Sequence, residues 1–418
     1  MGRRSGLAQG RGRSLNVAAG DDTSRKPATR LVTAGRRPEW TGPVVNPPVW
    51  RASTHLYESM AELAAGRPNA DGHFYYGRRG SPTQWALADA LTGLEPGAAG
   101  TVLYPSGVAA IAGALLAVLR PGDVVAMTDN AYEPSRNLAR GLLHDFGVET
   151  RFFDPLDLDA FRACLCERTR AVLLESPGSL TMEVCDVPAL AAIARERGVV
   201  SILDNTWASP LGFPALAHGV DISVMSLTKH VGGHSDLMMG SASAGPELYA
   251  RLRRTAQMLG QTVSPDDAAL ALRGLRTMGL RLEQTTRTAL ALAEWLAARP
   301  EVAQVLCPML PGAPGHDLWQ RDFTGGCGLF SFVLRGGSVA ARARLADALE
   351  LFGIGYSWGG FESLVVPVDP ASIRDHMAWP LAGLDPDDRY GLRLAIGLED
   401  SADLIADLAR GFAAYAGD

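Results

Sequence analysis

A regular alternation of short apolar runs with alanine- and leucine-rich stretches, between about residues 86 and 275, constrains the fold most strongly. Strands are predicted at Thr101–Tyr104, Val124–Met127, Thr150–Phe153, Ala171–Glu175, Val199–Asp204, Ile222–Ser226 and Gly240–Ala244. Helices are predicted between them, including Ala109–Leu119, Ser135–Phe146, Leu158–Cys166 and Val187–Glu196. This alternation predicts an α/β fold with a mainly parallel, seven-stranded sheet covered on both faces. Ligands of such sheets bind beyond the carboxyl ends of the strands.

The segments on either side of this alternation have different patterns. Residues 1–35 are rich in Gly, Arg, Ser and Ala and show no apolar periodicity, which predicts a disordered tail. Residues 36–85 carry many Pro and Gly residues and are expected to form an extended arm rather than a domain. A long helix is predicted near 282–298, with strands near 302–306, 330–334 and 392–396 and helices near 339–351 and 402–414. This order predicts a main domain over 86–275 and a smaller α+β domain over 276–418.

Composition argues against several classes of function. The net charge of −6, from 39 basic and 45 acidic residues, argues against a nucleic-acid surface. The five cysteines, with no C-x-x-C pair, argue against a disulfide scaffold and a zinc site and favour a reducing, cytoplasmic location. The basic N-terminal segment lacks the apolar core of a secretory signal. Because no apolar run reaches about 18 residues, no membrane span is expected.

Only two of the basic residues are lysines, Lys26 and Lys229. A coding bias toward arginine explains the other cations, and it makes the surviving lysines informative. Arginine stays protonated, whereas a lysine amine can lose its proton and act as a nucleophile. Lys26 lies in the expected tail, so Lys229 is the candidate for a chemical role.

Lys229 directly follows the strand predicted at Ile222–Ser226, and Ser226, Thr228 and two glycines surround it. It could be an ordinary surface lysine, but these hydroxyls and tight turns suit a phosphate beside an amine that forms a Schiff base. Asp204 ends the preceding predicted strand and could cap a helix or act as a functional acid. Together with Lys229, this carboxylate suits the pyridinium nitrogen of pyridoxal phosphate.

Two further loops could complete such a site. Gly107 and Val108 lie where a predicted strand turns into a helix. Backbone N–H groups at a helix start bind phosphate, although many loops of this kind look alike. Tyr132 follows the next predicted strand and could stack on an aromatic cofactor or simply pack on the core.

Together these segments resemble the cysteine/methionine-metabolism family of pyridoxal-phosphate enzymes of fold type I. The specific element is S-x-T-K-x-x-x-G-H-S-D, which runs from Ser226 to Asp236, and the match extends from about residue 36 to the end. The resemblance implies the PLP-dependent transferase-like fold, a Schiff base between Lys229 and pyridoxal 5′-phosphate, and a pyridine nitrogen that Asp204 keeps protonated. It further implies that the cofactor phosphate is held by Gly107, Val108, Ser226 and Thr228, with Tyr76 and Arg78 from the arm of a neighbouring subunit.

Within the family, the residues are most similar to those of bacterial cystathionine β-lyases. Tyr356, Ser357 and Trp358 match the pocket wall of that group, whereas γ-synthases and γ-lyases usually read Glu-Ser-Leu-Gly-Gly there. Ser179 stands where the γ-elimination relatives usually carry Asn. Arg393 matches the arginine that binds the substrate carboxylate, a contact that Ser357 would assist.

The resemblance implies a carbon–sulfur β-lyase that splits L-cystathionine into homocysteine, pyruvate and ammonia, a step of transsulfuration and methionine biosynthesis. Lys229 would remove the Cα proton, and Tyr132 would stack on the cofactor ring and help to deprotonate the incoming amine. Because the arm would serve a neighbour's site, a homodimer is the minimum assembly and a homotetramer is expected. No metal, nucleic-acid or membrane partner is expected.

Three alternatives stay open. A β-lyase could act on another cysteine S-conjugate, because single pocket residues change specificity only modestly. A cystathionine γ-synthase or γ-lyase of the same family is disfavoured by the pocket wall. A non-catalytic scaffold on an enzyme fold would be expected to lose Lys229, Asp204 or Arg393, and all three are present.

Overall fold

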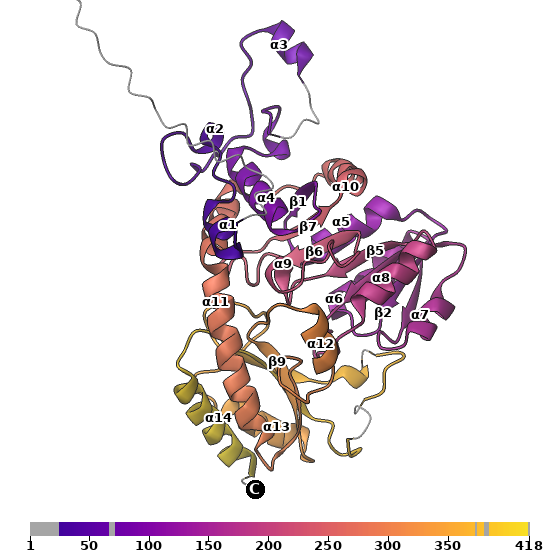
Figure 1. Cartoon of the computed structure of the whole chain (residues 1–418), viewed down its shortest axis with the longest axis vertical. Helices are drawn as coiled ribbons and strands as arrows, with labels where there is room; N and C mark the ends of the chain where they lie inside the picture. Colours follow the sequence, from indigo (N-terminus) through magenta and orange to yellow (C-terminus); the bar gives the residue numbers. More distant parts are fainter. Residues whose placement is uncertain (1–24, 67–71, 373, 380–383, 417–418) are drawn as a thin grey trace, which may run out of the picture.

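The computed structural model describes residues 25–66, 72–372, 374–379 and 384–416. Figure 1 shows a domain built on a large sheet, a smaller domain that ends with the C-terminus, and the helix α11 (Pro265–Ala297) running along both. The N-terminal arm, which carries α2 (Pro38–Thr41) and α3 (Met60–Ala65), extends away from this body.

The large sheet has seven strands in the order β1-β7-β6-β5-β4-β2-β3. They are β1 (Gly100–Tyr104), β2 (Val124–Thr128), β3 (Glu149–Phe153), β4 (Thr169–Glu175), β5 (Val200–Asp204), β6 (Ile222–Ser226) and β7 (Gly240–Ala244). Among these strands, β7 runs antiparallel to its neighbours β1 and β6, and the other neighbouring pairs are parallel. The predicted mainly parallel, seven-stranded sheet is therefore confirmed.

Apolar side chains are buried on both faces of the sheet. Successive residues of one strand contribute to different cores, because their side chains point to opposite faces. Val172 and Leu174 of β4 belong to one core, whereas Ala171 and Leu173 belong to the other. The helices of this domain are α4 (Pro82–Leu94), α5 (Gly107–Val118), α6 (Glu133–Leu138), α7 (Leu158–Cys164), α8 (Val187–Glu196), α9 (Ser209–Gly212) and α10 (Pro246–Met258). The helix predicted at Ser135–Phe146 is interrupted, since a π-helical turn over Ala139–Leu143 follows α6.

The smaller domain contains a five-stranded sheet in the order β10-β11-β12-β9-β8. Its strands are β8 (Val302–Leu306), β9 (Leu329–Leu334), β10 (Gly353–Ile354), β11 (Leu364–Val368) and β12 (Gly391–Ala395). Its helices are α12 (His316–Asp322), α13 (Val339–Asp347) and α14 (Ser401–Ala416). The long helix α11 begins at Pro265 rather than near residue 282, and the Ser264 side chain caps it by accepting the N–H of Asp266.

The expectation of a disordered tail through residue 35 is wrong for the last part of that segment. Helix α1 (Pro27–Thr33) buries Leu31 in the core. Arg276 of α11 donates hydrogen bonds of 2.7 Å to the carbonyl oxygens of Leu31 and Ala34. Residues 1–24 lie outside the described residues, and none of the helices described is both long and apolar enough for a membrane span.

Candidate active site

A cavity of about 340 Å³ opens at the carboxyl ends of β4, β5 and β6. This is the position that the parallel topology predicts for a ligand. All predicted site residues except the two on the arm line it: Gly107, Val108, Tyr132, Asp204, Ser226, Thr228, Lys229, Tyr356, Ser357, Trp358 and Arg393. The two domains thus build the site together, because Tyr356, Ser357 and Trp358 belong to the smaller one.

Lys229 stands in the turn that follows β6, and its amine faces the smaller domain. The Nζ atom donates a 2.7 Å hydrogen bond to Ser357 Oγ and lies 5.4 Å from the centroid of the Trp358 ring. Burial and the positive charge of Arg393 lower the pKa of Lys229 to about 8, although Asp204 acts in the opposite direction. The cavity therefore makes a neutral, nucleophilic amine available close to neutral pH.

Asp204 ends β5 and receives two hydrogen bonds from Thr206. Both the hydroxyl and the backbone N–H of Thr206 donate to Asp204 Oδ1. The same hydroxyl oxygen accepts the N–H of Ser226 at 2.9 Å, so it ties the carboxylate to the end of β6. Burial raises the pKa of Asp204, and the Thr206 hydrogen bonds and Lys229 oppose this shift. A fixed carboxylate of this kind fits the pyridinium nitrogen of pyridoxal phosphate.

Glu175 is a cavity residue that sequence reasoning missed. It ends β4 directly beside Asp204 in the strand register, and its Oε2 atom accepts the N–H of Tyr132 at 2.6 Å. Burial and the charge of Asp204 raise the pKa of Glu175 well above its usual value. Its position at the end of a predicted strand is the sequence feature that could have identified it as a site residue.

The start of α5 forms a cradle that suits a phosphate. Ser106 caps this helix by accepting the N–H of Ala109, and Gly107 and Val108 follow. A Cβ atom on Gly107 would lie 2.8 Å from the Cβ of Ser226, so only glycine allows this close approach. The Thr228 hydroxyl is already engaged, because it donates to Met239 O and accepts Met239 N–H.

Arg393 on β12 is a buried cation that suits a carboxylate ligand. Its exposed fraction is 8%, and among the described residues Nη2 donates a single long hydrogen bond, of 3.4 Å, to Ser357 O. Its Nε has no hydrogen-bond partner among the described residues. Burial lowers the pKa of this guanidinium. A buried, incompletely bonded arginine is costly unless an anion pairs with it.

The pocket wall carries strain at one residue and exposes another. Ser357 has a φ of +84°, a backbone conformation that persists only where the surroundings hold it. Trp358 packs edge-on against the buried His230, with ring centroids 5.1 Å apart. Tyr356 lines the cavity and is 89% exposed as a residue, so it lies at the rim.

The two predicted arm residues are the exceptions. Among the described residues that line the cavity, Tyr76 and Arg78 are absent. Tyr76 is exposed, and Arg78 donates a 2.8 Å hydrogen bond to the carbonyl oxygen of Gln257. Their role in a neighbouring subunit stays a prediction.

Comparison with known proteins identifies the family of this chain. A family model for Cys/Met metabolism PLP-dependent enzymes matches residues 28–413. Cystathionine beta-lyase MetC of Escherichia coli is 45% identical over 396 residues, which cover 93% of this chain and 98% of that protein. Cystathionine beta-lyase of Salmonella typhimurium is 43% identical over 398 residues, which cover 94% of this chain and 99% of that protein.

Solved structures give the same result. Cystathionine gamma synthase from Xanthomonas oryzae pv. oryzae, in complex with aminoacrylate and cysteine, matches with a TM-score of 0.84 at 33% identity. The match covers 94% of this chain and 98% of that one. These similarities show that the chain belongs to the Cys/Met metabolism family of PLP-dependent enzymes, with pyridoxal 5′-phosphate as its cofactor.

Proposed function

We propose that this chain is a PLP-dependent carbon–sulfur lyase of the cystathionine β-lyase type, which cleaves L-cystathionine to homocysteine, pyruvate and ammonia. One observation carries the proposal: the Lys229 amine is hydrogen-bonded to Ser357 in a cavity shared with Asp204 and Arg393. The relatives named cystathionine beta-lyase, at 43% to 45% identity, support the choice of reaction.

The cavity residues can divide the work of a β-elimination. Arg393 binds the substrate's α-carboxylate as a fork and so fixes the Cα–H bond for removal. Lys229 Nζ accepts the Cα proton while Ser357 Oγ orients it. Asp204 would hold a proton at the pyridine nitrogen of PLP, and the bound PLP would supply an electron sink for charge at Cα. The thiolate then departs from Cβ and takes up a proton to become homocysteine, and water hydrolyses the remaining aminoacrylate to pyruvate and ammonia.

The cavity walls favour β-elimination over γ-chemistry. Ser179, Tyr356 and Trp358 all line the cavity. These are the three residues by which the sequence differs from γ-synthases. A γ-synthase is the second candidate, because a cystathionine gamma-synthase of Mycobacterium bovis is 36% identical over 387 residues. Another cysteine S-conjugate is a further possible substrate, since the same walls would accept a different thiol leaving group.

The exposed arm supports a homo-oligomer, with a dimer as the minimum and a tetramer as the expected assembly. Tyr76 and Arg78 do not line the cavity of their own chain. The arm exposes large apolar side chains at Val44, Val45, Val49, Trp50, Leu56, Met60, Leu63, Phe74 and Tyr76. Exposed apolar surface of this extent is typical of an interface. Docking of the arm on a second copy would bring Tyr76 and Arg78 to the neighbour's cofactor phosphate.

The proposed location is the cytoplasm, where homocysteine release would serve methionine biosynthesis. All five cysteines are free, which suits a reducing compartment.

Thiol release from L-cystathionine and from a second cysteine S-conjugate tests the carbon–sulfur cleavage and the substrate preference of the proposed function. The purified, PLP-loaded protein should release thiol with the higher kcat/KM from cystathionine. Lys229→Ala, as the matched control, should lower turnover by at least about 10²-fold because it removes the general base. A Lys229→Ala protein with normal turnover would overturn the proposed role of Lys229.

A further inference from the structure

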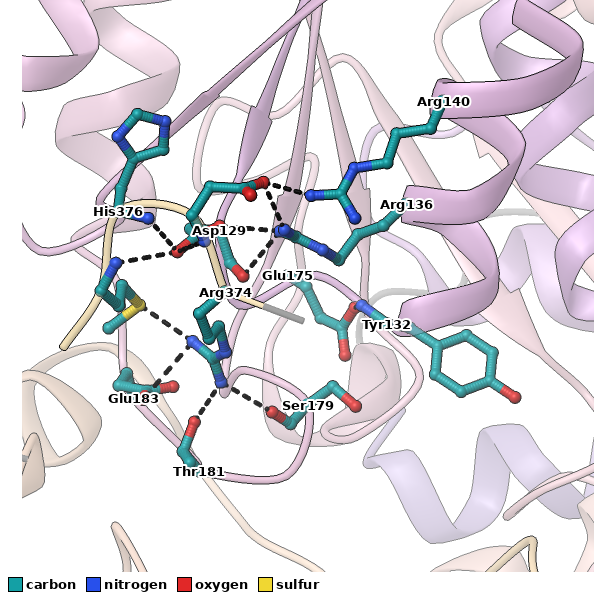
Figure 2. Close-up of polar contacts among 12 residues, drawn as sticks. Asp129, Tyr132, Arg136, Arg140, Glu175, Ser179, Thr181, Glu183, Arg374 and His376 are labelled. Carbon is teal, nitrogen blue, oxygen red and sulfur yellow. Dashed lines mark hydrogen bonds and ion pairs between the residues drawn. The ribbon is translucent and has the colours of Figure 1, made fainter. Parts of the chain in front are cut away.

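A buried polar cluster joins the smaller domain to the loops that carry Tyr132 and Ser179 (Figure 2). We call this cluster the clamp and define it as Asp129, Arg136, Arg374 and the backbone of residues 375–377. Its members come from the loop after β2, from α6, and from the segment between β11 and β12. The two sides of the clamp are therefore far apart in sequence.

Asp129 is the centre of the clamp, and its side chain is 0% exposed. Its carboxylate accepts three successive backbone N–H groups, those of Asp375 at 3.0 Å and of His376 and Met377 at 2.8 Å each. Arg136 Nη1 donates a fourth contact at 2.9 Å. Burial opposes ionisation of Asp129, but the N–H groups and Arg136 outweigh it and the pKa is lowered.

Arg136 bonds both Asp129 and Asp375, and its side chain is 1% exposed. It donates from Nη1 to the carbonyl oxygen of Asp129 at 2.8 Å and from Nη2 to Asp375 Oδ2 at 2.8 Å. Its guanidinium carbon lies 4.2 Å from the centroid of the Phe152 ring. Removal of Arg136 would leave the buried Asp129 carboxylate without its ion-pair partner, whereas removal of Asp129 would leave Arg136 paired with Asp375 alone.

Arg374 extends the clamp to the wall of the cavity. Its side chain is 4% exposed, and Nη2 donates to the carbonyl oxygen of Ser179 at 3.2 Å and to the Thr181 hydroxyl. Nη1 lies 3.7 Å from Glu183 Oε1. Figure 2 shows these contacts converging on the one guanidinium.

Residues 179–182, which Arg374 contacts, form a wall of the cavity and include strained backbone. Ser179, Leu180 and Met182 all line the cavity. Leu180 and Met182 have φ values of 72° and 60°, a left-handed conformation that non-glycine residues rarely adopt. Such backbone conformations persist only where surrounding contacts fix them, and Arg374 supplies part of that fixation.

The loop with Tyr132 is bonded to the same wall. The N–H of Ser179 donates to the carbonyl oxygen of Asn130 at 3.0 Å, directly beside Asp129. The backbone N–H of Tyr132 donates to Glu175 at the end of β4. A shift of residues 374–377 would therefore reach both Tyr132 and the wall at 179–182.

We propose that Asp129, Arg136 and Arg374 are positioning residues that fix Tyr132 and the wall at 179–182 through residues 374–377, and so set the kcat/KM of the enzyme for its amino-acid substrate. The kinetic part of this inference rests on the proposed function. The structural part, the fixation of residues 375–377 by Asp129, is independent of it.

The chain offers a matched control for Asp129. Asp407 of α14 has a side chain that is 1% exposed and bonds Arg410. Its carboxylate accepts the successive backbone N–H groups of Glu350, Leu351 and Phe352 at 2.9, 2.8 and 3.3 Å. It lies outside the cavity lining. Asp129 does not line the cavity either, but its loop is bonded to Ser179 and carries Tyr132, which do. Asp129→Asn and Asp407→Asn thus remove the same kind of contact at two different places in the fold.

The test compares these two variants as PLP-loaded proteins by thermal unfolding, cofactor content, amide hydrogen exchange and steady-state kinetics. Both should lose thermal stability and retain the cofactor. Only Asp129→Asn should speed exchange in a peptide that covers residues 374–379, by at least about tenfold. Only Asp129→Asn should lower kcat/KM, by about 10- to 100-fold, because misplacement at a distance weakens alignment of the reacting groups.

Equal kinetic constants for Asp129→Asn and Asp407→Asn, or unchanged exchange in residues 374–379, would overturn the clamp proposal. If Asp129→Asn does not fold, Arg374→Gln gives the same readouts, with the faster exchange expected in residues 179–182. Failure of the unmodified protein to release thiol would refute the proposed function, while the exchange comparison would still decide whether the clamp holds residues 375–377.

Discussion

Lys229 owes its proposed chemistry to its immediate surroundings. The amine is buried and lies near the positive charge of Arg393, and both lower its pKa to about 8. An ordinary lysine is almost fully protonated at neutral pH. The lowered pKa leaves a useful fraction of neutral amine without requiring any further base.

We predict that capture of pyridoxal 5′-phosphate by the cofactor-free protein becomes faster as the pH rises and levels off above about pH 8. A lysine with a lowered pKa loses its proton as the pH rises through that value, and only the neutral amine attacks an aldehyde. Stopped-flow absorbance from about pH 6 to about pH 10 would measure this. Arg393→Met should move the midpoint upward, and a midpoint near the ordinary value of 10.5 in the unmodified protein would contradict the prediction.

Residues were predictable where their chemistry is unusual for their position. Lys229 and Asp204 each lie at or directly after a predicted strand end, and the structure brings both to the cavity. Thr206 was missed because its role depends on two neighbours in space, Asp204 and the N–H of Ser226. A threonine that bridges two strand ends has no signature in sequence.

Helix α11 passes so close to the loop after Lys229 that glycine is required at position 274. A Cβ atom on Gly274 would lie 2.2 Å from the carbonyl oxygen of Val231 and 2.3 Å from that of Gly232. Val231 and Gly232 lie two and three residues after Lys229, so α11 packs against the loop that carries this lysine. Gly274 also helps to explain why the first half of α11 was not predicted, since glycine is a poor helix former.

Gly274→Ala should destabilise the protein by about 1–3 kcal/mol, because the added methyl group overpacks this contact. The sign is opposite to the usual effect, since alanine is normally favoured over glycine inside a helix by about 1 kcal/mol. Gly93→Ala in α4 is the control, because a Cβ there meets nothing within 4 Å outside its own helix. Denaturant unfolding of both variants measures the difference, and equal stabilisation of the two would show that the close packing is not restrictive.

Strands and helices could be predicted from the sequence where a run of apolar residues is uninterrupted and as long as the element itself. The predicted strands of the large sheet agree with the observed ones to within about two residues, because buried parallel strands are short and continuously apolar. In the smaller domain, β10 and β11 escaped prediction, and Pro367 interrupts the apolar pattern of β11. Strand pairing across distant segments stabilises such elements, and local sequence does not record it.

At the scale of the whole molecule, the fold class could be predicted from the alternation of strands and helices. The contacts between segments far apart in the sequence could not be predicted from it. The clamp joins Asp129 to residues 375–377, and no local pattern connects these segments. The arm is the other feature of this scale, since Tyr76 and Arg78 are expected to act in a second copy of the chain.

The arm proposal predicts that two impaired variants restore each other's activity. Arg78→Ala should weaken retention of the cofactor in the neighbouring site, and Lys229→Ala removes the amine of its own site. In a mixed dimer, the Arg78→Ala chain keeps Lys229 and receives Arg78 from its partner, so one site is complete. Co-expression with two affinity tags should recover about a quarter of normal activity, as random pairing into dimers dictates. Unchanged cofactor affinity in Arg78→Ala, or no recovery on mixing, would remove the argument for a shared site.

The keto acid that the purified protein releases from L-cystathionine distinguishes β-elimination from γ-elimination. The cavity of Lys229, Asp204 and Arg393, walled by Tyr356 and Trp358, predicts pyruvate together with homocysteine. Release of 2-oxobutyrate together with cysteine would contradict this account and assign the site to γ-elimination.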